Sequence, residues 1–404
     1  MEENGVSPPS PEVSPVQLSG CIEDLVKFVL QCAVNGDDLR LSAEFCSGLL
    51  KDEDKVVDDS VRSSNSQSSP QSDLSEGVRL YPLYKHLASA LKHWIVSGSF
   101  FSPCENALSI CEDDSLKPIK DKWNELVSQK GPELVTMLKS VKFRLHVQEP
   151  FFSQLKDGQK TIEGRCATGD YTLMQSGDLI LFNNCLMLEV QDVHHYASFV
   201  EMLEAESLEK VLPGVLSIEE GEQVYRRFYT KEKEQLNGVL AICVGRPASQ
   251  PCSVLSDIIS GLGYRGIQSL LGLKQTVGTI PQTLPPARST LLSSFTLPHK
   301  PEVKGCGLTD GARALAKHVN RCSSNYWGTF EGDDSTKNHL ALEVITRIIL
   351  HCCWMNVHIV QPHDAVFEIR VAEGYGARWS KDGTKFIGFL EPYMEDGHSK
   401  KWRH

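Results

Sequence analysis

The residues whose types and spacing best suit chemistry lie in the segment GQKTIEGR, which begins at Gly158. Side chains alternate along a strand, so a strand here would place Glu163 and Arg165 on one face and Lys160 on the other, at the rim of a sheet. Two cations with one carboxylate suit a phosphate or a base edge, because the carboxylate orients the cations. The alternative is a salt bridge that only stabilises the end of a strand.

This spacing resembles the G-x-K-x-x-E-x-R signature of the activating-signal-cointegrator homology (ASCH) domain, matched at Gly158, Lys160, Glu163 and Arg165. Further features of that family follow in order. They are an E-P-x-F entry at 149–152, a G-D-x-I step at 177–180, an L-P-G step at 212–214 and the closing segment YRRFYTKEKEQLNGVLAI at 225–242. Several ordered motifs are more specific than one short match. The resemblance covers residues 142–246.

The resemblance implies a β-barrel of the PUA-like superfamily whose cleft holds RNA, lined by Gly158, Lys160, Glu163 and Arg165. The sequence offers four more candidates for the rim of this cleft: His194, His195, Arg226 and Arg227. The histidine pair has a structural alternative, since one of two adjacent strand histidines must face the core side and be hydrogen-bonded there. The arginine pair has one too, as solvated helix charge.

An enzymatic function is the alternative. Some small proteins of similar barrel are amidohydrolases acting on acetylated cytidine, with a lysine and a threonine near the signature and a glutamate further on. In a hydrolase, Lys160, Thr161 and Glu163 would be the catalytic residues. The threonine position, three residues after the lysine, holds Glu163 here. A carboxylate beside Lys160 favours the charged lysine and so opposes its action as a base. We therefore expect binding rather than catalysis.

Composition limits how RNA is bound. The 404 residues carry a formal net charge of −11, which is unfavourable for nonspecific contact with phosphates. Residues 1–141 hold 13 basic and 22 acidic residues, a net charge of −9, whereas residues 142–246 hold 11 and 16, a net charge of −5. We expect weak RNA binding, confined to a cleft at Lys160 and Arg165 rather than spread over a basic face.

Other classes of site are not indicated. The 13 cysteines include no C-x-x-C pair and the histidines no H-E-x-x-H motif, so we expect neither a metal site nor a cofactor. No stretch approaches the ~20 apolar residues that a membrane helix needs, so no membrane partner is expected. The N-terminus MEENGVSPPSPEVSP lacks the features of a secretory signal. We expect an intracellular protein of the nucleus, the cytoplasm or both.

The elements that must position these residues predict a multidomain α+β protein. A Pro/Ser-rich stretch, 1–18, is expected to be disordered. Residues 19–141 show helical spacing, interrupted by an acidic, Ser-rich loop at 51–77 that we expect to be disordered. Residues 142–246 change to period two, with five strands and S-x-x-E capping boxes at Ser198 and Ser217. Residues 247–300 are expected to be a linker with a short helix.

The last unit, 301–404, is predicted to be α+β. It has helices at 309–320 and 337–355 and a three-stranded meander after them. The sequence alone assigns it no function. The whole pattern predicts an RNA-binding or RNA-associated adaptor, with the N-terminal and C-terminal units engaging protein partners. The alternatives are the hydrolase and a protein-interaction scaffold of the transcription-coactivator type whose barrel holds no ligand.

Overall fold

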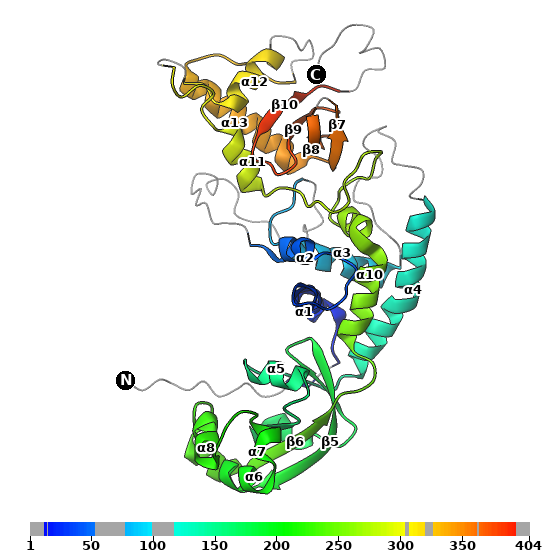
Figure 1. Cartoon of the computed structure of the whole chain (residues 1–404), viewed down its shortest axis with the longest axis vertical. Helices are drawn as coiled ribbons and strands as arrows, with labels where there is room; N and C mark the ends of the chain where they lie inside the picture. Colours follow the sequence, from blue (N-terminus) through cyan, green and yellow to red (C-terminus); the bar gives the residue numbers. More distant parts are fainter. Residues whose placement is uncertain are drawn as a thin grey trace. The chain divides into compact units, whose positions relative to one another are not determined.

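The structure is a computed structural model, and the residues that it describes are 12–13, 15–52, 77–98, 117–303, 307–319, 326–361 and 363–392. Most of the expected disordered loop, 53–76, lies outside them. The chain forms two compact units, Met1–Val29 with Gln129–Ile258 and Leu30–Ser128 with Ile259–His404. The expected fold class is confirmed: a helical N-terminal region, a central curled sheet, and a C-terminal sheet with helices (Figure 1).

The N-terminal region forms helices where apolar residues recur at helical spacing. These are α1 (Ile22–Val34), α2 (Ala43–Leu50), α3 (Leu83–Ser97) and α4 (Lys117–Ser140). The expectation of disorder through residue 18 is wrong at its end. A short strand, β1 (Glu12–Val13), pairs with β2, and both Val16 and Leu18 are buried. Burial of these two side chains offsets the entropy of ordering a Pro/Ser-rich segment.

The sheet of the first unit contains the five expected strands. They are β2 (Phe143–Leu145), β3 (Ile162–Cys166), β4 (Leu179–Phe182), β5 (Leu186–Tyr196) and β6 (Val239–Gly245). The order is β1-β2-β4-β5-β6-β3, with β2 and β4 parallel and the other pairs antiparallel. The sheet is therefore a half-barrel, and β3 is its end strand, with one edge that has no ladder partner among the described residues.

Both faces of this sheet are covered. One face holds a core that includes Phe143, Ile180 and Leu240, to which α5 (Phe151–Lys156) adds Phe152 and Leu155. The short helices on the other side are α6 (Phe199–Ala205), α7 (Leu208–Val211), α8 (Ile218–Arg226) and α9 (Lys231–Asn237). Both predicted capping boxes are confirmed. Ser198 and Ser217 accept the amides of the glutamates three residues on, and each glutamate accepts the amide just before its serine.

The sequence after the first sheet is more regular than expected. Residues 247–300 hold two helices, α10 (Pro251–Leu270) and α11 (Arg288–Phe295), where one short helix was predicted. Gly263, at φ 57°, interrupts α10 with a kink. The glycines and prolines that indicated a linker thus lie within and between helices. The helices form because the apolar residues around these positions bury enough surface to order the segment.

The second unit ends in an antiparallel sheet of order β10-β9-β8-β7. Helices α11, α12 (Asp310–Val319) and α13 (Asp334–His351) contact it (Figure 1). Its strands are β7 (Trp354–Val360), β8 (His363–Arg370), β9 (Gly376–Ser380) and β10 (Phe386–Leu390). The predicted helix to Met355 is too long, and β7 was missed. The first residues of β7, Trp354 and Met355, continue the apolar helical pattern of α13. The change from helical spacing to strand alternation is therefore not visible in the sequence at this point.

The two faces of this second sheet differ in chemistry. Phe367, Ile369 and Trp379 are fully buried on one face. On the other, the register aligns Asn356 of β7 with Glu368 of β8 and then with Arg378 of β9. We call this second side the polar face. Asn356 donates to the hydroxyls of Thr276 and Thr279, so a segment before α11 borders the polar face at β7.

Two general expectations can be compared with the described residues. No described helix is long and apolar enough to cross a membrane. Nine cysteines fall in this part of the chain, all as free thiols, and five of them are buried. Burial raises the pKa of the Cys21 thiol to about 12, which suits a small packed side chain better than a reactive one.

Glu368 makes the stability of the second unit sensitive to acid. Burial alone would raise its pKa, but a hydrogen bond from His358 and the charges of Arg370 and Arg378 lower it to about 2. A carboxylate with a lowered pKa contributes stability that is complete above its unfolded value, 4.5, and is lost as pH falls toward 2. The full loss is worth about 3 kcal/mol, of which about 1.4 kcal/mol has occurred by pH 3.5. We expect Glu368→Gln to destabilise the chain at pH 7 and to remove this dependence on pH. Urea denaturation at pH 7 and pH 3.5 measures the difference.

The control for this prediction is Glu343→Gln, because Glu343 is an exposed partner of His339 on α13. That variant should follow the wild-type dependence on pH. Equal acid sensitivity of the wild type and Glu368→Gln would contradict the stabilising role of Glu368.

Candidate functional site

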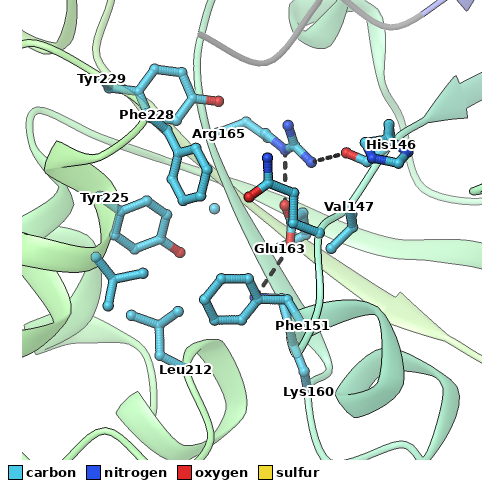
Figure 2. A pocket seen from close by; sticks show the side chains of 13 residues that line it. His146, Val147, Phe151, Lys160, Glu163, Arg165, Leu212, Tyr225, Phe228 and Tyr229 are labelled. Atoms are coloured by element: carbon cyan, nitrogen blue, oxygen red, sulfur yellow. Dashed lines mark hydrogen bonds and ion pairs between the residues drawn. The ribbon is translucent and has the colours of Figure 1, made fainter. Parts of the chain in front are cut away.

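A cavity of about 170 Å³ opens along the free edge of β3 in the first unit (Figure 2). Its walls come from four parts of the chain: the segment from the end of β2 to the start of α5, the signature segment, the end of α7, and the end of α8 with the turn after it. The lining residues are His146, Val147, Gln148, Phe151, Lys160, Glu163, Gly164, Arg165, Leu212, Val224, Tyr225, Phe228 and Tyr229. The cavity thus brings together segments up to about 80 residues apart.

Glu163 is the centre of the charged cluster in this cavity. Its Oε2 lies 3.1 Å from Lys160 Nζ and its Oε1 lies 2.8 Å from Arg165 Nε. All three side chains are buried. The predicted pairing of Glu163 with Arg165 is confirmed, but Lys160 does not stand at an exposed rim. Since β3 begins at Ile162, Lys160 precedes the strand, and strand alternation does not hold it on the opposite face.

The cluster also closes the free edge of β3. Lys160 Nζ donates to the carbonyl oxygens of Ile162 and Val211, and Arg165 Nη2 donates to that of His146 at 3.0 Å. The hydroxyl of Tyr225 accepts the amide of Gly164. Side chains therefore satisfy backbone groups that a neighbouring strand would otherwise satisfy. The signature residues build the cavity as well as line it.

Burial and mutual charge set the protonation of the cluster. Burial lowers the pKa of Lys160, although the adjacent Glu163 opposes this. Burial alone would raise the pKa of Glu163, but Lys160 and Arg165 outweigh it and lower the pKa. Burial alone would also lower the pKa of Arg165, but Glu163 raises it above its ordinary value. Glu163 and Arg165 are thus ionised at neutral pH, and the lysine is the group whose charge is least favoured.

Aromatic side chains form much of the remaining wall. Figure 2 shows Phe151, Tyr225, Phe228 and Tyr229 around one opening, with Leu212 beside them. Tyr225 stacks on Phe199 with ring centroids 4.0 Å apart, which fixes its position. Sequence reasoning did not include these aromatics in the site. The signal was present, since three of them lie in the closing segment of the family pattern.

The other predicted site residues lie outside the cavity lining. Gly158 occupies an exposed turn at φ +74°, where an L side chain is strained. His194 pairs with Glu206 and Asp192, and His195 is exposed.

The predicted arginines and the threonine also lie outside the lining. Arg226 pairs with Glu222 and Glu234, and Arg227 is exposed. The amide of Thr161 donates to the carbonyl oxygen of Lys210.

One group of possible metal ligands occurs in the part of the chain that the structure describes. His194, Glu206 and Cys243 each offer an atom within 4.8 Å of the others. His194 Nδ1 already lies 2.6 Å from Glu206 Oε1. Burial, together with Glu206 and Asp192, raises the pKa of the Cys243 thiol.

The cavity depends on the absence of a side chain at Gly164. A Cβ there would lie 2.3 Å from the Tyr225 hydroxyl oxygen and 2.9 Å from Met202 Cε. We expect Gly164→Ala to displace Tyr225 from the wall and to cost about 1–3 kcal/mol of unfolding free energy, because the surrounding core is packed. Urea denaturation measures the loss. Gly20→Ala is the control, since a Cβ at Gly20 meets open space. A Gly164→Ala chain as stable as Gly20→Ala would contradict this packing.

Comparison with known proteins yields two family matches. A model described as the ASCH domain matches residues 145–248, and a model described as the CdiA C-terminal tRNase toxin domain matches residues 298–391. No curated protein matches.

Two solved structures are similar to part of the chain. The hypothetical protein PH0355 is 44% identical over 25% of this chain and 94% of its own, with a TM-score of 0.25. PF0455 from Pyrococcus furiosus is 47% identical over 26% of this chain and 96% of its own, with a TM-score of 0.24. With the signature residues in and just before β3 and the family match over the half-barrel, the resemblance inferred from the sequence is confirmed: this chain belongs to the ASCH domain family, and residues 145–248 are its ASCH domain.

Proposed function

We propose that the ASCH domain binds RNA by holding one unstacked base in the cavity at β3. The observation that carries this proposal is the combination of aromatic walls with a charged cluster at Lys160, Glu163 and Arg165. Proteins that read single-stranded RNA stack splayed bases on aromatic side chains and hydrogen-bond the base edges. At about 170 Å³ the cavity is smaller than the ~300–1,000 Å³ of pockets for drug-sized ligands, which suits a single base.

The internal contacts of the cluster favour a base over a phosphate in this cavity. Lys160 Nζ already contacts one carboxylate and two carbonyl oxygens. Arg165 is paired with Glu163 and donates to a backbone carbonyl. Few donors remain to replace the strong hydration of a phosphate, whereas an uncharged base edge needs few. This agrees with an acidic domain that contacts RNA locally.

Hydrolysis of a modified nucleoside has one observation in its favour and one against. A buried lysine with a lowered pKa is what a lysine base needs. The threonine position of the family's hydrolases holds Glu163, however, and Thr161 is not part of the lining. The hydroxyls that line the cavity belong to Tyr225 and Tyr229, whose pKa values are raised by burial. Binding is therefore the function that the geometry supports better.

Phe228 offers a direct test of base stacking. It is half-buried at the cavity wall, so its removal affects folding less than removal of the buried cluster would. Stacking of one base contributes ~1–3 kcal/mol, so we expect Phe228→Ala in the full chain to weaken binding of single-stranded RNA about tenfold or more at low salt. Phe228→Trp should retain binding. Fluorescence anisotropy with a labelled mixed-sequence RNA measures the affinity.

Leu236→Ala is the matched control, because Leu236 is an exposed apolar residue of the same domain, 84% accessible. Absence of RNA binding by the wild type at low salt would refute the proposal and leave the scaffold alternative. Equal binding by Phe228→Ala and Leu236→Ala would exclude this cavity. Release of acetate from acetylated cytidine by the full chain, lost in Lys160→Arg, would establish the hydrolase instead.

A second function is supported by the match to the tRNase toxin domain at residues 298–391, which covers α12, α13 and the second sheet. That description concerns the matched family, and it suggests that this unit cleaves RNA. RNA would then be the shared substrate of both family-matched regions. The ASCH domain would hold the RNA, and the C-terminal unit would break a phosphodiester bond in it.

Incubation of the full chain with transfer RNA tests this second function. We expect discrete fragments rather than general degradation, because a single bound geometry exposes few phosphodiester bonds. Denaturing electrophoresis separates the fragments, and a mock purification measures contaminating ribonucleases. Phe228→Ala should still cleave at saturating RNA. Transfer RNA left intact at all RNA and protein concentrations would contradict cleavage without affecting the binding proposal.

A further inference from the structure

The polar face of the second sheet holds more positive than negative charge. Glu368 Oε1 accepts from Arg370 Nε at 2.7 Å, and Glu368 Oε2 accepts from Arg378 Nε at 3.0 Å and from Arg378 Nη2 at 2.7 Å. One carboxylate therefore serves two guanidinium groups. The three side chains are only 4%, 10% and 13% exposed, for Glu368, Arg370 and Arg378 in turn. A buried surplus charge is costly unless an anion compensates it.

The two arginines differ in what remains available. Arg370 Nη1 donates to the carbonyl oxygens of Gly374 and Glu391, so this guanidinium is held among protein acceptors. Arg378 uses Nε and Nη2 for Glu368, while its Nη1 donates to no acceptor in the described part of the chain. Arg378 is thus fixed by Glu368 and still has an N–H group to offer a ligand.

Open space lies next to Arg378. Its register partner on β10 is Gly388, which shares the polar face. A Cβ at Gly388 would meet nothing within 4 Å, in contrast to Gly376 on β9, where a Cβ would lie 2.1 Å from the Ile369 carbonyl oxygen. The sheet therefore leaves room above Gly388, the cross-strand neighbour of Arg378. On the opposite side of Glu368, Asn356 is already bonded to Thr276 and Thr279.

We propose that the polar face at Arg378 and Gly388 binds a phosphodiester group of RNA. The Nη1 group of Arg378 can donate a charge-assisted hydrogen bond to a phosphate oxygen, and Glu368 holds the guanidinium group in place before the ligand arrives. The anion would balance the surplus charge. His358 Nε2 lies 3.4 Å from Glu368 Oε2, the oxygen that Arg378 also contacts. The choice of RNA among phosphate-containing ligands rests on the proposed function, and the site falls within the residues matched by the tRNase toxin family.

Filling the space at Gly388 tests the site without removing a charge. We expect Gly388→Leu in the full chain to lower the affinity for single-stranded RNA about tenfold, because a hydrogen bond to a charged group is lost. The slope of log affinity against log salt should fall by about 0.7, the share of one phosphate in a single strand. Gly20→Leu is the control, since a Cβ there also meets open space. Urea denaturation shows whether each variant folds.

The outcomes separate this inference from the proposed function. If the wild type binds no RNA, both fail. If Phe228→Ala weakens binding while a folded Gly388→Leu chain binds as Gly20→Leu does, RNA binding stands and the site at Arg378 is wrong. If Gly388→Leu does not fold, Arg378→Lys, which keeps the charge but loses the guanidinium group, replaces it and should also weaken binding. If inorganic phosphate binds the wild type but not Gly388→Leu, and RNA affinity is equal in both, the ligand is free phosphate rather than RNA.

Discussion

The ASCH domain depends on one buried carboxylate held between two cations. Glu163 pairs with Lys160 and Arg165, and both cations also reach backbone carbonyls at the free edge of β3. Removal of one partner of such a buried cluster leaves an uncompensated charge, which costs about 3–5 kcal/mol. The signature residues are therefore required for the half-barrel itself, and any ligand must use the contacts that remain.

The same principle recurs in the second sheet with a different balance. Glu368 is also shared by two guanidinium groups, but the space beside Arg378 is open, whereas the cluster at Glu163 is enclosed by aromatic rings. Local surroundings thus give two similar charge clusters different chemistry. One lies at the base of an aromatic cavity that suits an uncharged ring, and the other offers a fixed N–H group that suits an anion.

The sequence predicted those interactions whose two partners lie within a few residues of each other on one element. The pairing of Glu163 with Arg165 follows from strand alternation, and both capping boxes follow from a three-residue spacing. It failed where the partner lies on a different element. His194 and Arg226 were assigned to the cleft from their residue type, but Glu206 at the end of α6 and Glu234 on α9 pair with them outside the cavity. The polar face at Arg378 was not predicted although its three strands were, because the cross-strand register that aligns Glu368, Arg378 and Gly388 is not visible in the local pattern of any one strand.

The capped edge of β3 has a consequence for association with other chains. An end strand with unpaired backbone groups is a template for an added strand, which leads to aggregation or strand exchange. Here the carbonyl of Ile162 is occupied by an ammonium group, and the amide of Gly164 by a phenol. An approaching peptide would have to displace buried charges to pair with this edge. The residues that define the family thus also act as a barrier that keeps one copy of the domain from extending the sheet of another.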